Sequence, residues 1–582
     1  MNVTDAPTEG AITIPEAPAR GRWATTEQLD RAVADVAAHA EAWVATSIAD
    51  RRRLLDQMVR DTLVVAEDWA QDAARAKGIA PTSPAWGEDV ATGPMQLVRN
   101  LRLLDGTLAG LQEHGSVQLP RPPRLEGGRV VVPTFPTSTL DRAVYPGHTG
   151  ETWLQPHITD PSQVRAGQAY RAPGPGRVAF VLGAGNVSSV GAADVLTKLY
   201  AENQVCVLKM NPVNEHLGPY IETALQSLQR EGVLRIVYGG IEAGQHLVDH
   251  QDVDTIHMTA SDKTHDAVVF GVGDEGERNK RERTPRITKE VTSELGNVSP
   301  VIVVPGPWTE EDLAYQGKHL ATMLVNNAGF NCACPRVLVT HRRWNRRDAL
   351  LDALRASLAE APQRHAYYPG ARQRWEHFTE AHPEAELFGE AADEQVPWTL
   401  LPDLDPADRD DIAFRVEAFN GVMGEAPLDA PRDVAAYLDA AVEFCNQRLW
   451  GTLAATILVH PRSLKDPATA AALERGLADL RYGTVAVNTW AATAYGLGSV
   501  PWGAYPGHPL HDIQSGRGWV RNTFLLEDVE KSVLRAPWRL GKKPPMSYDF
   551  ATFPQMARRL VRLEAEGDWR QLPGIVADGV RG

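Results

Sequence analysis

Apolar residues recur every three or four positions between residues 25 and 111, which predicts a series of amphipathic helices. Thr25 and Gln28 are spaced like a capping box and indicate where the first helix begins. From Gly176 the pattern changes to short, continuous apolar runs, such as GRVAFVL and QVCVLK, which are separated by helical stretches and end in small or polar residues. Strands and helices that alternate in this way predict a parallel, doubly wound sheet that binds ligands at the carboxyl ends of its strands.

A second strand–helix series begins near Pro300 with VIVVPG and continues through RVLVTH, LAATILVHP and GTVAVNTW. Between the first helices and the first sheet, residues 118–172 are rich in Pro, Gly and Arg and contain strand-like pieces such as RVVVPTF. This stretch suits an extended ribbon or an oligomerisation arm, with a loop as the alternative. The predicted units are a flexible N-terminal arm (1–24), a first αβ domain (25–296) that includes the ribbon, a second αβ domain (297–487), and a return to the first domain with a C-terminal extension (488–582).

Composition and charge narrow the class of protein. A chain of 582 residues with 43% hydrophobic and 23% charged residues is typical of a globular protein with two or three structural units. The net charge of −15 argues against a nucleic-acid-binding surface. We expect no membrane span and no secretory signal, because no apolar run is long enough and the N-terminus lacks a basic start. Four cysteines without CxxC spacing favour a reduced, cytoplasmic protein without structural zinc or another metal.

Two residues carry candidate chemistry. Cys332 lies in NNAGFNCACPR just before a predicted strand, and Glu294 is the only carboxylate in the short turn SELGN. A cysteine nucleophile and a carboxylate that activates water are sufficient for covalent acyl chemistry followed by hydrolysis. Alternatively, a free cysteine is simply a buried packing residue. The pair therefore indicates catalysis only if the chain also supplies a cofactor site and an oxyanion site.

The motifs, in their order along the chain, resemble those of the NAD(P)-dependent aldehyde dehydrogenase superfamily from about residue 25 to residue 530. NAGFNCAC resembles the nucleophile motif of that family, SELGN its glutamate motif, and LGAGN the segment with its oxyanion-binding asparagine. The resemblance implies that Cys332 is the nucleophilic thiolate, Glu294 the general base and Asn186 an oxyanion donor. It also implies NAD or NADP as the cofactor and an aldehyde as the substrate.

The same resemblance assigns residues to the cofactor. Lys209 in VLKMNP is similar to the lysine that binds the adenosine ribose, and Ser261 in MTAS to the residue at the pyrophosphate. VEAFNG resembles the segment in which a glutamate, here Glu417, holds the nicotinamide ribose with Phe419 beside it. PWGA and SGRG, which lie between residues 501 and 518, match the closing motifs of the family.

Several positions depart from the family pattern. Ala260 and His265 replace glycines near the pyrophosphate, and GxGxxG is absent. Pro212 replaces a carboxylate that usually receives the ribose hydroxyls, so we expect NADP+ to be at least tolerated. The insertion at 271–289 is dense in charge, and we expect a solvated loop there. The alternative is phosphate binding by its basic side chains, which are Arg278, Lys280, Arg281 and Arg283.

Two aromatic residues suit structural roles, and one of them also suits a functional role. His257 is expected within the strand before the cofactor turn in a structural role, whereas Trp502 suits either the substrate funnel or core packing. Phe330 and Asn297 replace a glutamine and a glycine of the family motifs.

The resemblance implies an α/β, aldehyde dehydrogenase-like fold with two doubly wound αβα domains, one cofactor-binding and one catalytic, plus an oligomerisation arm. The predicted reaction is oxidation of an aldehyde to a carboxylic acid, in a homodimer or homotetramer. The alternatives are a CoA-acylating aldehyde dehydrogenase and a non-catalytic member that retains the fold.

Overall fold

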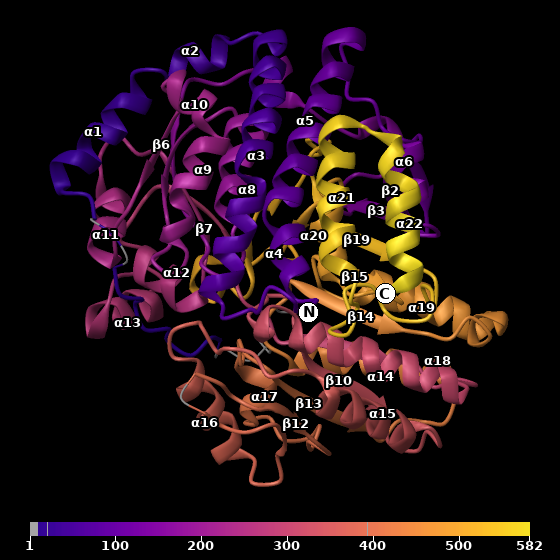
Figure 1. Ribbon diagram of the computed structural model, residues 1–582. Helices are drawn as coiled ribbons and strands as arrows, with labels where there is room; N and C mark the ends of the chain where they lie inside the picture. Colours follow the sequence, from indigo (N-terminus) through magenta and orange to yellow (C-terminus); the bar gives the residue numbers. More distant parts are fainter. Residues whose placement is uncertain (1–9, 20, 22, 393) are drawn as a thin grey trace.

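The computed structural model describes residues 10–19, 21, 23–392 and 394–582, which form two large sheets with helices on their faces (Figure 1) and one small two-stranded sheet. The first sheet has six strands in the order β17-β8-β7-β4-β5-β6, of which all but β17 run parallel. Its central strands β4, β5 and β7 are buried along nearly their whole length, as expected for a sheet covered on both faces. The strands are β4 Val178–Leu182, β5 Val205–Lys209, β6 Leu234–Val237, β7 Thr255–Thr259, β8 Glu290–Glu294 and β17 Gly516–Arg517.

The N-terminal helices pack on this first sheet, as their apolar periodicity predicts. Thr25 caps the first of them through the predicted capping box with Gln28. The covering helices include α1 Thr26–Ala37, α3 Ile48–Ala76, α5 Pro94–His114, α8 Val190–Leu196, α11 Ile241–Asp249 and α12 Asp262–Val269.

The second sheet has eleven strands in the order β1-β2-β3-β19-β15-β14-β9-β10-β13-β12-β11. Separate apolar clusters fill its two faces: helices α14 and α15 contribute to one, and α18 and α19 to the other. The helices are α14 Glu310–Val325, α15 Arg347–Glu360, α18 Val434–Arg448 and α19 Pro467–Asp479, and the parallel strands are β9 Ser299–Val303, β10 Pro335–His341, β12 Trp398–Leu401, β13 Val422–Leu428, β14 Ala454–Leu458 and β15 Thr484–Val487. The predicted fold class, α/β with two doubly wound sheets, is therefore confirmed.

The stretch 118–172 forms strands that complete the second sheet within the same chain. Its third strand, β3, pairs antiparallel with β19, and β19 pairs parallel with β15. The long strands are thus paired on both sides, and the two ends of the sheet are the three-residue strands β1 and β11. Assembly into a homodimer or homotetramer stays a prediction. The strands named here are β1 Arg124–Glu126, β2 Arg129–Phe135, β3 Thr149–Leu154, β11 Glu386–Phe388 and β19 Val529–Arg535.

The charged insertion forms a helix, α13 Gly273–Glu282, so the prediction of a solvated loop was wrong. Acidic residues lie in its first turn and basic residues in its last, which favours a helix through its dipole. Arg278 pairs within the helix with Glu275 at 3.9 Å, and Lys280 reaches α12, where it donates to Asp266 at 2.6 Å. Periodicity did not reveal this helix because it buries only Gly276.

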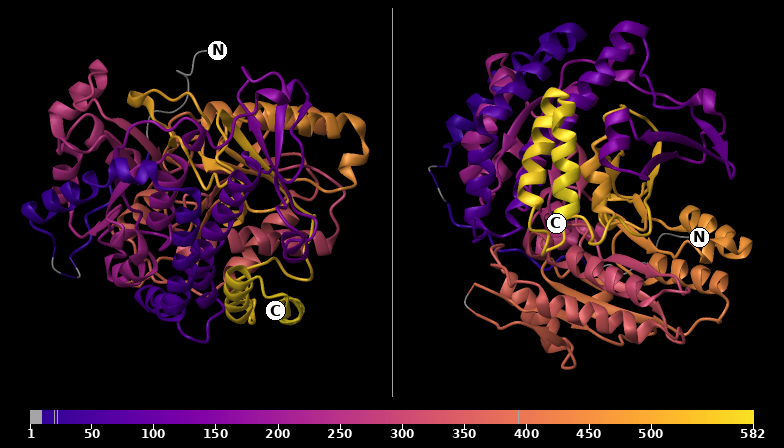
Figure 2. Two further views of the ribbon diagram at one scale, coloured as in Figure 1. Left: turned by 90° about the horizontal axis from the view of Figure 1, so that it is seen from above. Right: turned by 45° about the vertical axis from the view of Figure 1, so that its right-hand side comes forward.

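The two ends of the chain pack against the first sheet and its helices. A C-terminal hairpin, α21 Phe553–Glu566 and α22 Leu572–Arg581, lies against α5 and against α4 Trp86–Thr92 (Figures 1 and 2). At the other end, the arm predicted to be flexible falls partly outside the described residues, but residues 11–17 line the cavity between the sheets. Among the helices of the described segments, none is both long and apolar enough to cross a membrane.

Candidate active site

A cavity of about 610 Å³ lies between the two sheets, within the size range of small-molecule sites. The carboxyl ends of β4, β5, β7 and β8 open into it from one side, because parallel strands place their ends along one edge. The loop before β10 reaches it from the other side. Every residue that the sequence assigned to catalysis or to the cofactor lines this cavity; these are Asn186, Lys209, Ser261, Glu294, Cys332, Glu417 and Phe419.

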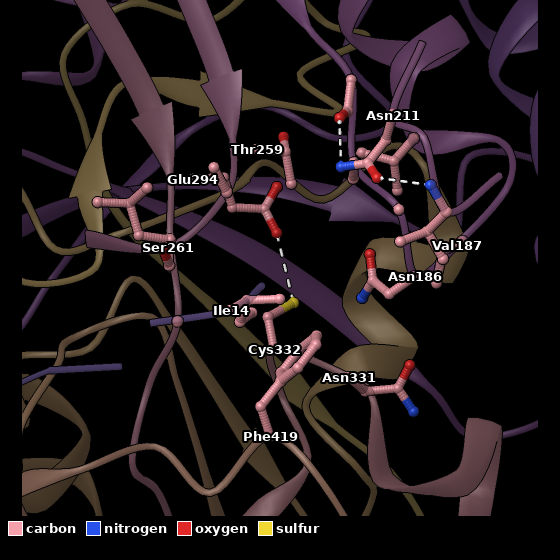
Figure 3. A pocket seen from close by; sticks show the side chains of 18 of the residues that line it. Ile14, Asn186, Val187, Asn211, Thr259, Ser261, Glu294, Asn331, Cys332 and Phe419 are labelled. Atoms are coloured by element: carbon pink, nitrogen blue, oxygen red, sulfur yellow. Dashed lines mark hydrogen bonds between the residues drawn. The ribbon is translucent and has the colours of Figure 1, made fainter. Parts of the chain in front are cut away.

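Cys332 and Glu294 meet in the cavity, although they come from different sheets (Figure 3). The Cys332 Sγ lies 3.4 Å from the Glu294 Oε1. The turn that precedes the cysteine holds Asn327 and Ala328 at φ values of 49° and 55°, a left-handed conformation that is costly for a residue with a Cβ. Strain of this kind persists only where the surroundings fix it. Here the Asn327 amide donates to the carbonyl oxygens of Asn186 and Phe330, each at 3.1 Å.

Burial raises the pKa values of both Cys332 and Glu294. It raises the pKa of the Cys332 thiol well above its usual range, and the charges of Glu294 and Glu417 add to the effect. Burial, followed by the charge of Asp194, also raises the pKa of Glu294 to about 7. The Trp502 indole opposes this by donating to the Glu294 Oε1 at 2.7 Å. A neutral thiol thus faces a carboxylate whose pKa suits a general base at neutral pH.

Asn186 also lies near Cys332, in a different direction from Glu294 (Figure 3). Its side-chain Nδ2 donates to the Phe330 backbone carbonyl at 3.0 Å. The backbone carbonyl of Asn186 accepts from the Tyr367 hydroxyl at 3.1 Å. A primary amide has two N–H groups, so the bond to Phe330 leaves one for another acceptor.

The residues assigned to the adenosine and pyrophosphate lie away from the cysteine. Lys209 ends β5 and donates from Nζ to the Gly239 carbonyl at 2.6 Å. Burial lowers its pKa to about 8. Ser261 is the N-cap of α12, where its Oγ accepts from the Thr264 N–H at 3.2 Å.

Glu417 is only 3% exposed, and its Oε1 has no hydrogen-bond partner among the residues that the structure describes. Burial raises its pKa to about 7. Gly296 makes room for the carboxylate, since a Cβ at that position would overlap it. A buried polar atom without a partner costs free energy, and because Glu417 lines the cavity, its carboxylate is a candidate acceptor for a ligand hydroxyl. Phe419, at φ 42°, packs its ring 5.1 Å from the Tyr368 ring.

Three positions left open by the sequence are placed by the structure. His257 lies within β7, where its Nδ1 contacts the Thr292 hydroxyl at 2.9 Å. His265 is fully buried in α12 and does not line the cavity, unlike Ala260. Trp502 fits both interpretations, because it belongs to an apolar cluster and also binds Glu294.

The sequence missed the N-terminal segment, whose residues 11–17 line the cavity. Figure 3 shows Ile14 next to Cys332. Only the apolar pair Ile12 and Ile14, in an otherwise Pro- and Ala-rich stretch, could have signalled burial.

Fold and site together define an α/β protein with a cysteine–carboxylate pair between two doubly wound sheets. A model of the family described as "Aldehyde dehydrogenase family" matches residues 189–372. No curated protein sequence matches the chain significantly. The resemblance to aldehyde dehydrogenases that the motifs predicted is found again in this match, over residues 189–372, and in the shared fold.

Solved structures share the fold at low sequence identity. Aldehyde dehydrogenase C from Pseudomonas syringae, solved as a mutant complexed with NAD+ and octanal, is 17% identical over 89% of this chain and 90% of its own, with a TM-score of 0.57. Glyceraldehyde-3-phosphate dehydrogenase from Methanocaldococcus jannaschii, complexed with NADP, is 15% identical over 92% and 99%, with a TM-score of 0.58. A putative aldehyde dehydrogenase from Burkholderia cenocepacia is 20% identical over 90% and 96%, with a TM-score of 0.57.

Proposed function

We propose that this protein oxidises an aldehyde to a carboxylic acid with NAD+ or NADP+, through a covalent intermediate on Cys332. The observation that carries the proposal is the 3.4 Å contact between the Cys332 Sγ and the Glu294 Oε1, in a cavity that extends as far as Lys209. Similar folds have been solved with NAD+ and octanal or with NADP, which supports the same classes of ligand here.

The residues present fit a dinucleotide. The unpaired Oε1 of Glu417 would accept the hydroxyls of the nicotinamide ribose, and Lys209 would donate to the adenosine ribose. Ser261, at the N-terminus of α12, would face the pyrophosphate, where the helix dipole favours negative charge. Bound there, the cofactor supplies the acceptor for a hydride.

The chain's own groups account for the other steps. The Cys332 thiol releases its proton to solvent, and its Sγ forms a bond to the aldehyde carbon, which leaves a negative charge on the oxygen. The free N–H of Asn186 and the Cys332 backbone N–H would donate to that oxygen; one such donor is typically worth about 10²–10³ in rate. The carbonyl re-forms as the hydride departs, and the result is a thioester. Water deprotonated by Glu294 then attacks, the C–S bond breaks, and the acid leaves.

The test is a panel of aldehydes assayed with NAD+ and with NADP+, each with and without coenzyme A. Reduced cofactor and the carboxylic acid product are both measured. Acid formed without coenzyme A is the expected result. Turnover that requires coenzyme A would instead indicate the acylating reaction, and binding without turnover would indicate a non-catalytic member.

The pH dependence of kcat should follow Glu294, because this residue acts in the hydrolysis of the thioester. Its pKa is raised to about 7, so the carboxylate that the reaction needs is lost as the pH falls through 7. Activity should therefore decline about tenfold for each pH unit below that point. A profile that stays flat down to pH 5 would exclude Glu294 as the base.

Trp502→Phe should move this acidic limb to higher pH. The substitution removes the indole N–H that stabilises the Glu294 carboxylate, while an aromatic ring remains in the cluster. A hydrogen bond to a charged group is worth about 1.5–3 kcal/mol, so a shift of about one pH unit is expected. Tyr495→Phe is the matched control, because its ring packs on Trp502 with centroids 5.8 Å apart but its hydroxyl does not bind Glu294. An equal shift in both variants would exclude a specific role for the indole bond.

A further inference from the structure

The cavity continues past the reactive pair to a second polar end, which the N-terminal segment helps to build. Lys209, Gly240 and Ile241 line that end from the first sheet, and Glu16 lines it from the N-terminal segment. The Glu16 Oε1 accepts a hydrogen bond from the Ile241 N–H, at the start of α11, at 2.6 Å. Gly240 is required for this contact, because a Cβ there would overlap with the Glu16 carboxylate.

The segment is fixed on both sides of Glu16. The Ala11 N–H donates to the buried Asp262 Oδ1 at 2.8 Å, and the Trp23 indole donates to the Glu215 Oε2 at 3.0 Å. Pro15 packs against Gly370, which belongs to the second sheet's side of the cleft. The segment therefore crosses the cleft with defined contacts on both walls.

Glu16 also acts electrostatically on Lys209. Burial lowers the pKa of that lysine, and the negative charges of Glu16 and Glu215 oppose this effect. The ammonium therefore has a carboxylate neighbour within the same end of the cavity. One Glu16 oxygen is committed to Ile241, but a carboxylate has a second oxygen and several acceptor sites.

We infer that Glu16 is the residue that selects NAD+ over NADP+. The inference rests on the proposed function, in which the nicotinamide lies at Cys332 and the adenosine ribose consequently reaches the Lys209 end of the cavity. A carboxylate beside the ribose accepts its hydroxyls and repels a 2′-phosphate. Pro212 occupies the position where the family has an acidic residue, so that position carries no carboxylate. Glu16, in the N-terminal segment, supplies a carboxylate to the same cavity.

The charges at this end give the direction of the preference. A 2′-phosphate would bring almost two negative charges to a place where one ammonium already faces a carboxylate. Pro212 lines the same cavity but carries no charge to offset that repulsion. NAD+ is therefore the expected cofactor, which reverses the expectation drawn from Pro212 alone.

The experiment compares Glu16→Gln with the wild-type chain by calorimetric titration of NAD+ and NADP+, so that binding is measured without turnover. The wild type should bind NAD+ at least about 30-fold more tightly than NADP+. In Glu16→Gln, NADP+ should bind about 10- to 100-fold more tightly than before and NAD+ several-fold more weakly, so that the preference disappears. Glu27→Gln is the matched control, since it removes an exposed carboxylate from α1 that does not line the cavity.

Each other outcome counts against the inference. An unchanged NAD+/NADP+ ratio in Glu16→Gln would overturn it, provided that the thermal midpoint shows a folded variant. If Glu16→Gln and a chain lacking residues 1–17 bind both cofactors more tightly by the same factor, the segment obstructs the site and does not select. Wild-type protein that binds neither cofactor would overturn the proposed function as well. Wild-type protein that binds NAD+ but oxidises no aldehyde would refute only the proposed reaction, and the ratio test would still decide the role of Glu16.

Discussion

Cys332→Ser should abolish aldehyde oxidation, with a fall in kcat on the order of 10⁴-fold or more, while cofactor affinity stays within about twofold of the wild type. A serine hydroxyl is far harder to deprotonate than a thiol, and the Glu294 carboxylate, with a pKa of about 7, is too weak a base to compensate. The covalent step is the only one that needs the sulfur, so binding should persist. Steady-state kinetics and a cofactor titration on the same preparation measure the two effects.

Cys334→Ser is the matched control for that experiment. The Cys334 Sγ is fully buried and lies 3.8 Å and 3.7 Å from the carbonyl oxygens of Met323 and Leu324, and the residue does not line the cavity. Its replacement should leave most of the activity. If instead Cys334→Ser is inactive and Cys332→Ser is active, the nucleophile has been assigned to the wrong cysteine.

Glu294→Gln should separate the two halves of the reaction. One equivalent of reduced cofactor per active site should appear in a burst, because a neutral glutamine no longer raises the pKa of the Cys332 thiol as the carboxylate does. The later steady state should be about 10²–10⁴-fold slower than in the wild type, since glutamine cannot accept a proton from water. Rapid-mixing absorbance traces give the amplitude of the burst and the rate that follows it.

Added coenzyme A distinguishes hydrolysis from acyl transfer in the same variant. If water is the natural acceptor, coenzyme A should not restore turnover in Glu294→Gln. If it does restore turnover, the thioester is intended for a thiol, and the acylating reaction replaces the hydrolytic one. A variant with neither a burst nor turnover would show that Glu294 is needed before the thioester forms.

The sequence predicted the sheets well because their strands are short apolar runs bounded by small residues. This pattern can be recognised in the sequence without knowing which strands lie side by side. It also predicted that Cys332 and Glu294 act together, since both lie in distinctive motifs, and the structure brings their side chains into contact. Whether they catalyse the reaction stays a prediction. The indole bond from Trp502 could not be predicted, because it joins residues 208 positions apart.

Other features could not be predicted from the sequence, for physical reasons. Helix α13 is held by local ion pairs and its dipole, and amphipathic periodicity records neither. The N-terminal segment has no regular structure, and its position depends on single contacts to distant residues, such as that of Glu16 with Ile241. Pro212 pointed toward NADP+ because the sequence did not show that Glu16 lines the same cavity.

The position of β19 sets the order in which the protein can fold during synthesis. This strand, Val529–Arg535, is made late but lies in the interior of the second sheet, between β3 and β15. At ordinary translation rates of about 5–20 residues per second, β3 waits on the order of tens of seconds for it. Until then β3 and β15 each present an open hydrogen-bonding edge, the kind of surface that pairs with other chains. A ribosome that stops before residue 529 therefore releases a chain whose second sheet lacks β19 and is divided into two parts, each with an open, aggregation-prone edge.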